Sequence, residues 1–467
     1  MKQLKQTFRL MSMAVLSLLM ATACSNDDND IAQQPAKAEG IPFNATISMG
    51  GNQTRALSDP DGDNKIQATW TSGEHVAMVY KVSGTTVVTD ATVTAVDNGS
   101  GKMKGTISAT LADGVTTGTP VTLIYPYSAV NTTGENIGKV KSDLFTGQNG
   151  LLTGDGSISA TCDLRQGSGT ITLATTPASL SSDVTMASQI AIWKLSLMNY
   201  EDGATNAYAI TTKSLTIKDG SDNVLAATNA SAIATSKSEF YMAVPAISSK
   251  DIKIEADYGD TYMLSKSGVT LAASTYYQST AKLARPLSSA KVPYTMGGTK
   301  YPADVRKVVS ADGRIFTTAS AATDAGTSAV ALICHVSSTG HGLALELNSS
   351  IGTANWSTAC SNPTSKGAVP GGAWKLPTKQ EWKDMLVKYV EADRMDSGVY
   401  GDTGLPIVDL RTKYESLGYS LPVDLYWSST EYVGDLAWLV GLDSSTASFG
   451  TSGMGNDVVR VLACLAF

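Results

Sequence analysis

Hydrophobic and polar residues alternate along much of the chain, in short runs separated by turn-forming residues. In residues 41–48, which read IPFNATIS, every second position from Ile41 onward is hydrophobic. A period of two predicts a strand with one buried face. Further runs of this kind lie within residues 66–80, 87–96, 105–109 and 121–127. Short strands at such intervals predict a β-sandwich.

A helical pattern appears in residues 377–391. Hydrophobic residues recur there at i, i+3, i+4 and i+7, namely Trp382, Met385, Leu386 and Tyr389. This spacing predicts a helix with one buried stripe. Thr378 and Glu381 have the spacing of a capping box, which marks the start of a helix. Strands are expected after it at residues 425–431, 436–442, 447–450 and 458–467.

The chain begins with a basic segment and a short hydrophobic run. The run covers residues 10–20, fewer than the roughly 20 residues that a membrane-spanning helix needs. Together with the small residues before Cys24, it predicts a secretory signal peptide over residues 1–23. The polar residues 24–40 are interpreted as a flexible tether.

Residues 21–24, which read ATAC, resemble the lipobox of bacterial lipoproteins. The resemblance implies cleavage before Cys24 and lipidation of this cysteine, with palmitate as an acyl group. The acidic residues within 26–30 resemble the signal that sends Bacteroidales lipoproteins to the outer face of the outer membrane. We therefore expect a cell-surface protein that is anchored in the outer membrane by its lipid. The alternative is a plain signal peptide with an incidental cysteine.

The amino-acid composition argues against several classes of function. The 467 residues carry a net charge of −7, and 16% of them are charged, which is low for a globular protein. A nucleic-acid partner is therefore not expected. The 5 cysteines show no zinc-type spacing, and 3 histidines leave little room for histidine chemistry. We expect neither enzyme activity nor a cofactor.

Six sequence segments, taken in order, resemble the Bacteroidales fimbrillin family of lipoprotein pilus subunits. They are TRALSDPDG (54–62), ATWTSGEHVAMVY (68–80), TLIYPYS (122–128), AIWKLSL (191–197), EFYMAVP (239–245) and YYQSTAKL (276–283). The resemblance implies a mainly β fold with two tandem transthyretin-like β-sandwiches. Their expected bounds are residues 41–175 and 176–285.

The same resemblance implies a route of assembly. An Arg-specific protease would cut after Arg55 and remove the first strand, residues 41–48. A strand from another pilus subunit would then fill the open groove, which is donor-strand exchange by β-augmentation. The alternative reading of Arg55 is an ordinary surface residue in an Asp-rich loop, and Lys65 is a poorer cleavage candidate.

Residues 286–298 are interpreted as a linker, and residues 299–467 resemble C-type-lectin-like modules of bacterial surface proteins. The segments that carry this second resemblance are GGAWKLPTKQEW (371–382), YWSSTE (426–431) and VRVL (459–462). It implies an α+β adhesive domain whose first and last strands pair. The usual sugar-binding motifs of calcium-dependent lectins are absent from the sequence. Asp424, Glu431 and Asp435 could supply oxygen ligands to Ca²⁺, although solvated carboxylates are the favoured reading.

Pairing of the first and last strands would make Cys334 and Cys464 candidates for a disulfide. Cys360 could bond to either of them instead, and buried free thiols are the alternative. A last strand that is held within its own sheet cannot be lent to a neighbouring subunit.

We therefore expect a pilus tip adhesin that joins other subunits by donor-strand exchange. Its C-terminal domain would bind a glycan or protein on a host or bacterial surface. The alternative is an outer-membrane lipoprotein that binds glycan and never polymerises.

Overall fold

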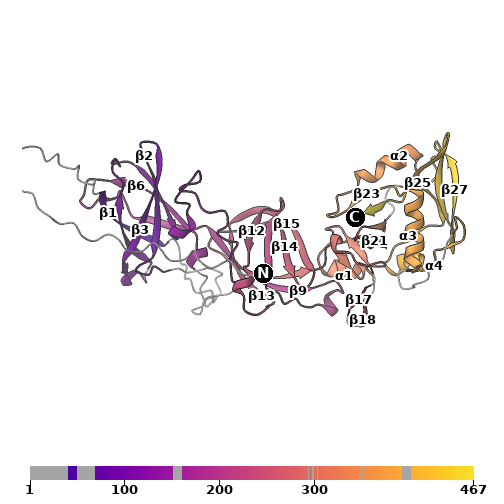
Figure 1. The fold of residues 1–467 in the computed structure, drawn as a ribbon, viewed down its shortest axis with the longest axis horizontal. Coiled ribbons are helices and arrows are strands. Elements are labelled where there is room, and N and C mark those ends of the chain that lie inside the picture. Colours follow the sequence, from indigo (N-terminus) through magenta and orange to yellow (C-terminus); the bar gives the residue numbers. More distant parts are fainter. Residues whose placement is uncertain are drawn as a thin grey trace, which may run out of the picture. The chain divides into compact units, whose positions relative to one another are not determined.

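A computed structural model describes residues 40–49, 69–101, 103–150, 160–292, 294–296, 299–301, 303–348, 352–391 and 401–467 (Figure 1). Strands dominate these ranges and form six sheets, which confirms the mainly β fold. Seven short 3-10 segments also occur in them. They are η1 (Asn98–Ser100), η2 (Tyr127–Ala129), η3 (Ala160–Cys162), η4 (Ala204–Asn206), η5 (Ala230–Ala232), η6 (Leu287–Ser289) and η7 (Asn362–Ser365).

The first sheet has the strand order β5-β2-β3-β4-β1-β8-β6-β7. Its strands are β1 (Ile41–Met49), β2 (His75–Val82), β3 (Thr85–Asp97), β4 (Lys104–Leu111), β5 (Pro120–Tyr125), β6 (Arg165–Thr172), β7 (Ser179–Leu180) and β8 (Val184–Ser188). Because β5 also pairs with β6, the sheet closes on itself around a hydrophobic core. The period-two pattern of β1 is confirmed, since Phe43, Ala45 and Ile47 are buried in that core.

The predicted boundary after residue 175 lies inside this sheet and needs correction. Strand β8 pairs in parallel with β1 from Ile47↔Val184 to Met49↔Met186, and it also pairs with β6. The first sheet therefore extends to Ser188. The boundary was misplaced because a parallel partner far along the chain leaves no turn signal between the two strands.

Residues 190–283 form two further sheets. One contains β9 (Ile190–Asn199), β10 (Tyr208–Ala209), β13 (Glu239–Pro245) and β16 (Tyr276–Leu283), and the other contains β11 (Leu215–Asp219), β12 (Val224–Ala227), β14 (Ile247–Asp257) and β15 (Thr261–Leu271). Side chains from both sheets meet in one core, including Leu195 of β9 and Ile254 of β14. Ala77 and Ile124 of the first sheet belong to the same core. The transthyretin-like arrangement of these sheets stays a prediction.

The C-terminal part combines two sheets with the four α-helices of the described ranges. The helices are α1 (Ala319–Asp324), α2 (Trp356–Ser361), α3 (Lys379–Glu391) and α4 (Val408–Ser416). One sheet has the order β20-β19-β21-β22-β28-β23, and the other has the order β24-β27-β26-β25.

The strands of the first of these sheets are β19 (Val308–Ser310), β20 (Ile315–Phe316), β21 (Ala329–Val336), β22 (Gly342–Glu346), β23 (Ala373–Lys375) and β28 (Cys464–Ala466). Those of the second are β24 (Leu405–Pro406), β25 (Asp424–Val433), β26 (Leu436–Leu442) and β27 (Thr446–Gly453). A core that includes residues from both sheets and from α3 and α4 holds this part together. Its α+β composition agrees with the expected C-terminal domain, whose likeness to lectins stays a prediction.

Residues 286–298 do not behave as the predicted linker. Leu287 of η6 is fully buried in the core of the C-terminal part, and Pro286 forms a bridge with Arg314. Strand β17 (Tyr294–Met296) pairs with β18 (Thr299–Tyr301). The described residues of this segment therefore belong to the folded domain itself.

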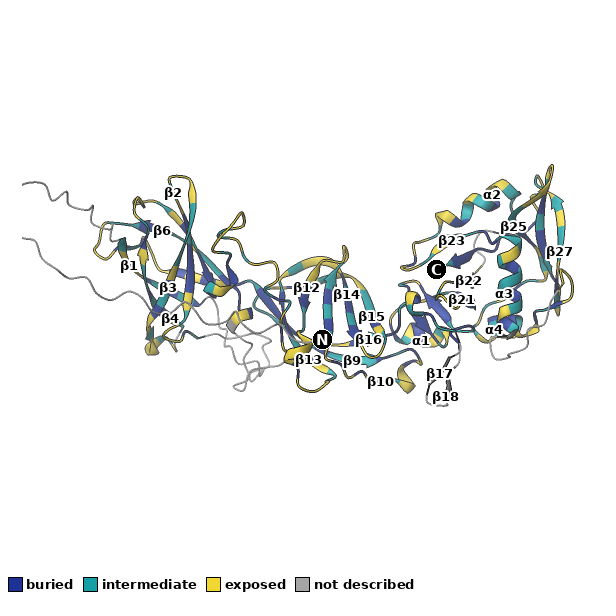
Figure 2. Cartoon of the chain, in the orientation of Figure 1, coloured by how far each residue is buried: buried dark blue, intermediate teal, exposed yellow. Residues whose placement is uncertain are grey.

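Helix α3 forms where the sequence predicts it. The backbone N–H of Thr378 donates to Glu381 Oε2 (2.9 Å), and the backbone N–H of Glu381 donates to Thr378 Oγ1 (3.1 Å). This is the complete capping box. The stripe that begins with Trp382 and ends with Tyr389 is buried, and Figure 2 shows the helix with buried and exposed sides.

Candidate functional site

Strand β1 lies inside the first sheet rather than at its edge. It pairs antiparallel with β4 from Ile41↔Leu111 to Ser48↔Lys104, and its other edge pairs with β8. Its exposed fraction is 1% at Phe43 and 0% at Ile47. Removal of β1 would therefore leave backbone donors and acceptors unpaired on two facing strand edges and empty several hydrophobic positions.

The outer face of β1 is polar and is fixed by hydrogen bonds. Ser108 Oγ donates to Asn44 Oδ1 (2.6 Å), and the backbone N–H of Asn44 donates to Ala178 O (2.9 Å). Any strand that replaced β1 would have to alternate hydrophobic and polar residues in the same register, because a shift by one residue reverses the two faces.

The predicted lipidation site Cys24 and the predicted cleavage site Arg55 both lie outside the described residues. Lys65 lies outside them as well. Among the helices of the described ranges, none has the length and hydrophobicity needed to cross a bilayer.

Strand β28 is enclosed on both edges. It pairs antiparallel with β22 and with β23, and the backbone groups of Gly342 and Phe467 exchange two hydrogen bonds (2.8 and 3.1 Å). The segment before and within β28 is fully or almost fully buried at Val459, Val461, Leu462, Ala463, Cys464 and Leu465. The expectation that the last strand pairs with the first strand of the module is wrong, since its neighbours are β22 and β23.

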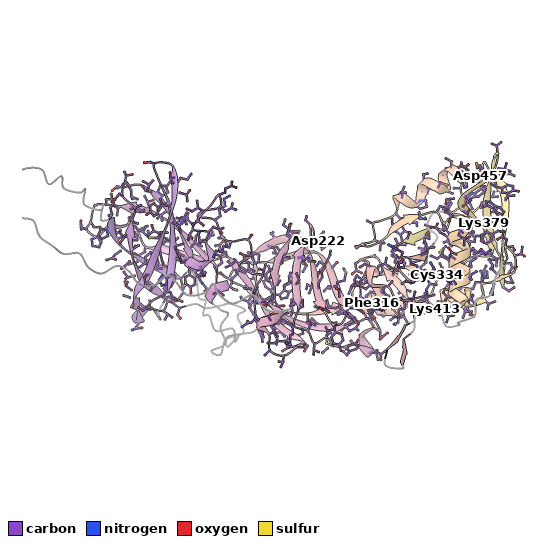
Figure 3. All side chains as sticks on the ribbon, viewed as in Figure 1. Asp222, Phe316, Cys334, Lys379, Lys413 and Asp457 are labelled. Atoms are coloured by element: carbon purple, nitrogen blue, oxygen red, sulfur yellow. The ribbon has the colours of Figure 1, made fainter. Side chains whose placement is uncertain are left out.

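This arrangement also corrects the expected Cys334–Cys464 disulfide. Both thiols are free and buried, and Figure 3 labels Cys334 on β21. Strand β22 lies between β21 and β28, which separates the two backbones by about 10 Å. A disulfide needs Cα atoms within about 7 Å. Cys360 is also free.

The buried thiols are poorly suited to reaction. Burial raises the pKa of Cys334 to about 12, and it raises the pKa of Cys464 as well. The pKa of the half-buried Cys360 is raised as well, first by burial and then by the charge of Glu431. Because the thiolate is the reactive form, these cysteines act as hydrophobic packing groups.

The three carboxylates considered for calcium are not assembled into a site. Asp424 Oδ2 accepts a hydrogen bond from Arg460 Nε (2.5 Å), while Glu431 and Asp435 are exposed. Throughout the part of the chain that the structure describes, no group of three or more His, Cys, Asp or Glu side chains could hold a metal ion. Glu431 and Asp435 are solvated, as the favoured reading expects, whereas Asp424 is paired with Arg460.

The C-terminal tryptophans divide into core and partly accessible residues. Trp382 and Trp427 are fully buried. The indole N–H of Trp382 donates to Trp427 O (3.1 Å), and the indole N–H of Trp427 donates to Ala354 O (2.7 Å). Trp374 is half-buried. Its indole N–H donates to Gly367 O (3.0 Å), and one side of the residue lines a cavity. Trp438 is half-buried beneath the ammonium of Lys379, whose Nζ lies 3.4 Å from the ring centroid.

A buried ionic network joins the sheets of residues 190–283 to the C-terminal part. Arg285 donates to Glu201 Oε1 (2.7 Å) and, through two nitrogens, to Asp304 (2.8 and 2.9 Å). Arg285 is 6% exposed, Glu201 is 8% exposed and Asp304 is 1% exposed. Lys307 Nζ lies 2.7 Å from Asp304 Oδ1. The carboxylates are thus compensated where water cannot reach them.

No protein-family model matches the chain, and no curated protein matches it either. Three of the solved structures that the chain is similar to are the following. A fimbrial protein from Bacteroides ovatus is 14% identical, and the match covers 92% of this chain and 99% of that one with a TM-score of 0.26. A fimbrial assembly protein from Parabacteroides distasonis is 12% identical, and the match covers 52% of this chain and 90% of that one with a TM-score of 0.27. The minor pilin of Streptococcus agalactiae is 9% identical, and the match covers 55% of this chain and 100% of that one with a TM-score of 0.25. Scores of this size do not establish a shared fold, so the function is argued from the chain's own geometry.

Proposed function

We propose that this protein is a lipid-anchored surface subunit of a pilus, that it accepts a strand from another subunit, and that it occupies the pilus tip. The observation that carries the proposal is the contrast between two strands. Strand β1 comes shortly before Arg55 in the sequence, whereas β28 is enclosed between two strands of its own sheet.

The position of β1 supports the acceptor role. Cleavage after Arg55 would release a segment that contains β1 and open a groove between β4 and β8. An incoming strand would regain backbone hydrogen bonds on both edges and bury hydrophobic side chains at the positions of Phe43 and Ile47. An incoming strand would therefore be held by backbone pairing and by side-chain burial together.

The enclosure of β28 supports the terminal position. Lending this strand to a neighbour would break its pairing with β22 and β23 and expose Leu465. A subunit that accepts a strand but keeps β28 would end a chain of subunits. The C-terminal domain would then be the part that meets a host or bacterial surface, and Cys24 would carry the lipid that holds the unassembled protein in the outer membrane.

Immunogold electron microscopy tests the terminal position. An epitope inserted at Ser221, in the exposed turn between β11 and β12, marks the subunit without disturbing a core residue. We expect gold particles at the free ends of pili. Gold distributed along the shafts would overturn the tip role, and gold confined to cell bodies would overturn pilus assembly itself.

A second candidate function is that of an outer-membrane lipoprotein that binds glycan without polymerising. The cavity beside Trp374 favours this function, because a ligand could bind in the C-terminal domain whether or not the protein is assembled into a pilus. The two functions differ in the fate of the N-terminal segment, which the glycan-binding lipoprotein would keep.

A further inference from the structure

A cavity of about 450 Å³ lies in the C-terminal domain, within the usual volume range of small-ligand sites. Its wall comes from several separate segments of the chain. The wall includes Glu346 and Asn348 at and after the end of β22, Lys366 after η7, Trp374 of β23, and Tyr419 after α4.

Two aromatic rings form part of the wall and are held by their polar ends. The indole N–H of Trp374 donates to Gly367 O (3.0 Å), and Tyr419 Oη donates to Ala329 O (3.4 Å). Both residues are half-buried. The rings are therefore fixed in place while part of each remains accessible from the cavity. Rigid, partly accessible rings offer flat surfaces for the C–H faces of a ligand at little cost in conformational entropy.

A buried ion pair supplies the polar part of the wall. The Lys366 ammonium contacts Glu346 Oε1, and the side chains are 13% and 5% exposed. Glu346 Oε2 accepts from the backbone N–H of Ala463 (3.2 Å), and Lys366 Nζ lies 5.6 Å from the centroid of the Trp374 ring. A carboxylate accepts several hydrogen bonds and an ammonium donates three, so this pair presents acceptors and donors side by side.

The charge of this pair restricts the ligand. Because Lys366 and Glu346 neutralise each other, the pair offers no net charge that would attract a charged ligand of either sign. A purely hydrophobic side chain would cover the pair without offering it a hydrogen bond, which is unfavourable. The cavity instead fits a neutral molecule whose neighbouring hydroxyl groups both donate and accept and whose C–H faces can lie against a ring.

We propose that this cavity binds a neutral sugar residue of a cell-surface glycan. This inference rests on the adhesive role of the C-terminal domain under the proposed function and names the chemical class of its ligand. The exposed Asn348 amide at the cavity wall adds a further donor and acceptor for a hydroxyl group. The sugar is held by side chains directly, without the carboxylates Asp424, Glu431 and Asp435.

Isothermal titration of the full chain with methyl glycosides of glucose, galactose, mannose, fucose and N-acetylglucosamine tests the proposal, with N-acetylneuraminic acid as a charged comparison. We expect at least one neutral glycoside to bind, with unchanged affinity in EDTA, and the charged sugar not to bind. Trp374→Ala should weaken binding by about tenfold or more, because it removes one aromatic surface and its packing against the sugar. Trp438→Ala, which removes a half-buried tryptophan from another sheet, should leave it unchanged.

Asn348→Ala changes an exposed residue and keeps the test valid if Trp374→Ala does not fold. It should weaken binding several-fold, as expected for one lost hydrogen bond. Absence of binding to all five neutral glycosides, or equal affinities in both cavity variants and the wild type, would overturn the inference. So would loss of binding in EDTA.

The failure of this inference can be told from the failure of the proposed function. Trp374→Ala should still enter pili and appear at their ends in the gold-labelling experiment. Attachment of piliated cells that persists in Trp374→Ala would overturn the sugar site and leave the tip role intact. If the protein binds a sugar but the gold particles lie along the pilus shafts, the tip role is overturned and the sugar site is left intact.

Discussion

Arg285 joins two parts of the chain through side-chain contacts. Its guanidinium contacts Glu201, which follows β9, and Asp304, which precedes β19. Since all three residues are buried, the network depends on every member being present. The connection between the middle sheets and the C-terminal domain is therefore sensitive to a single substitution.

Arg285→Leu should lower the free energy of unfolding by about 3–5 kcal/mol, because it leaves two buried carboxylates without their main partner. Urea denaturation followed by tryptophan fluorescence measures the change. Lys253→Met is the matched control, since it removes a cation from a partly exposed pair with Asp222. Its effect should stay below about 1 kcal/mol, and comparable losses in the two variants would contradict the role assigned to Arg285.

The same network predicts a pH dependence. Burial acts to raise the pKa of Asp304, but the hydrogen bonds and charge of Arg285 outweigh it and hold the pKa below the ordinary value. A lowered pKa in the folded state stabilises the protein above the ordinary aspartate pKa of about 3.9, and this contribution is lost as the pH falls through the lower value. Asp304→Asn should therefore lose less stability than the wild type between pH 5 and about pH 2. Acid titrations of the two proteins with identical slopes would exclude this contribution.

Local sequence signals predicted single residues well where the partner is close in the chain. The capping box of Thr378 and Glu381 and the buried stripe from Trp382 needed only a three- or four-residue spacing, and both are confirmed. Arg285 was not singled out, because its carboxylate partners lie 84 and 19 positions away. The cavity beside Trp374 was missed for the same reason, since its wall assembles only when several segments meet.

Strands β1 and β28 differ in what their removal would require. Residues 50–68, which follow β1, are mostly polar in the sequence, and a single cut after Arg55 would separate this strand from the rest of the chain. Strand β28 is held by two neighbours and by close packing, since a Cβ atom on Gly372 would lie 2.8 Å from Leu465 Cγ. The two strands thus suit opposite roles in an assembly.

A peptide experiment tests whether β1 can be exchanged. Residues 56–467 should unfold at a lower temperature than the full chain, because β4 and β8 would lack the strand between them. Adding the peptide IPFNATISM should raise the melting temperature in a concentration-dependent way. The control peptide carries asparagine in place of Phe43 and Ile47, and stabilisation by both peptides alike would argue against a specific groove.

Leu465→Ala tests the enclosure of β28. Leu465 is fully buried, so the substitution should cost about 2–5 kcal/mol in the unfolding of the C-terminal domain. Five of the 7 tryptophans lie between Trp356 and Trp438, which makes their fluorescence a suitable probe. Ala466→Ser, at a half-buried neighbour, should have a small effect. A mild effect of Leu465→Ala would mean that β28 is loosely held.

Alternation identified most strands, but not which strands pair. The burial of Phe43 and Ile47 followed from a period of two. Strand β8 carries the same alternation, yet its parallel pairing with β1 connects residues far apart in the chain, so it was assigned to the wrong unit. The interpretation of residues 286–298 as a linker failed because proline and glycine signal turns whether or not a domain ends there.

The parts of the chain combine into one account of a surface subunit. An N-terminal segment would anchor the protein, the first sheet would exchange a strand, and the C-terminal domain would bind a surface sugar. Residues 41–467 form one compact unit whose successive sheets share buried contacts, as the core containing Ala77 and Ile254 illustrates. The proposed strand exchange at the first sheet and the proposed sugar binding by the C-terminal domain would thus both take place in a single folded unit.

N-terminal sequencing of the protein from purified pili tests the central claim most directly. The account predicts that the mature chain begins at Ala56, and that an Arg55→Ala variant keeps its N-terminal segment and is absent from pili. A protein recovered from pili that still begins with lipid-linked Cys24 and retains residues 41–49 would contradict strand exchange at the first sheet.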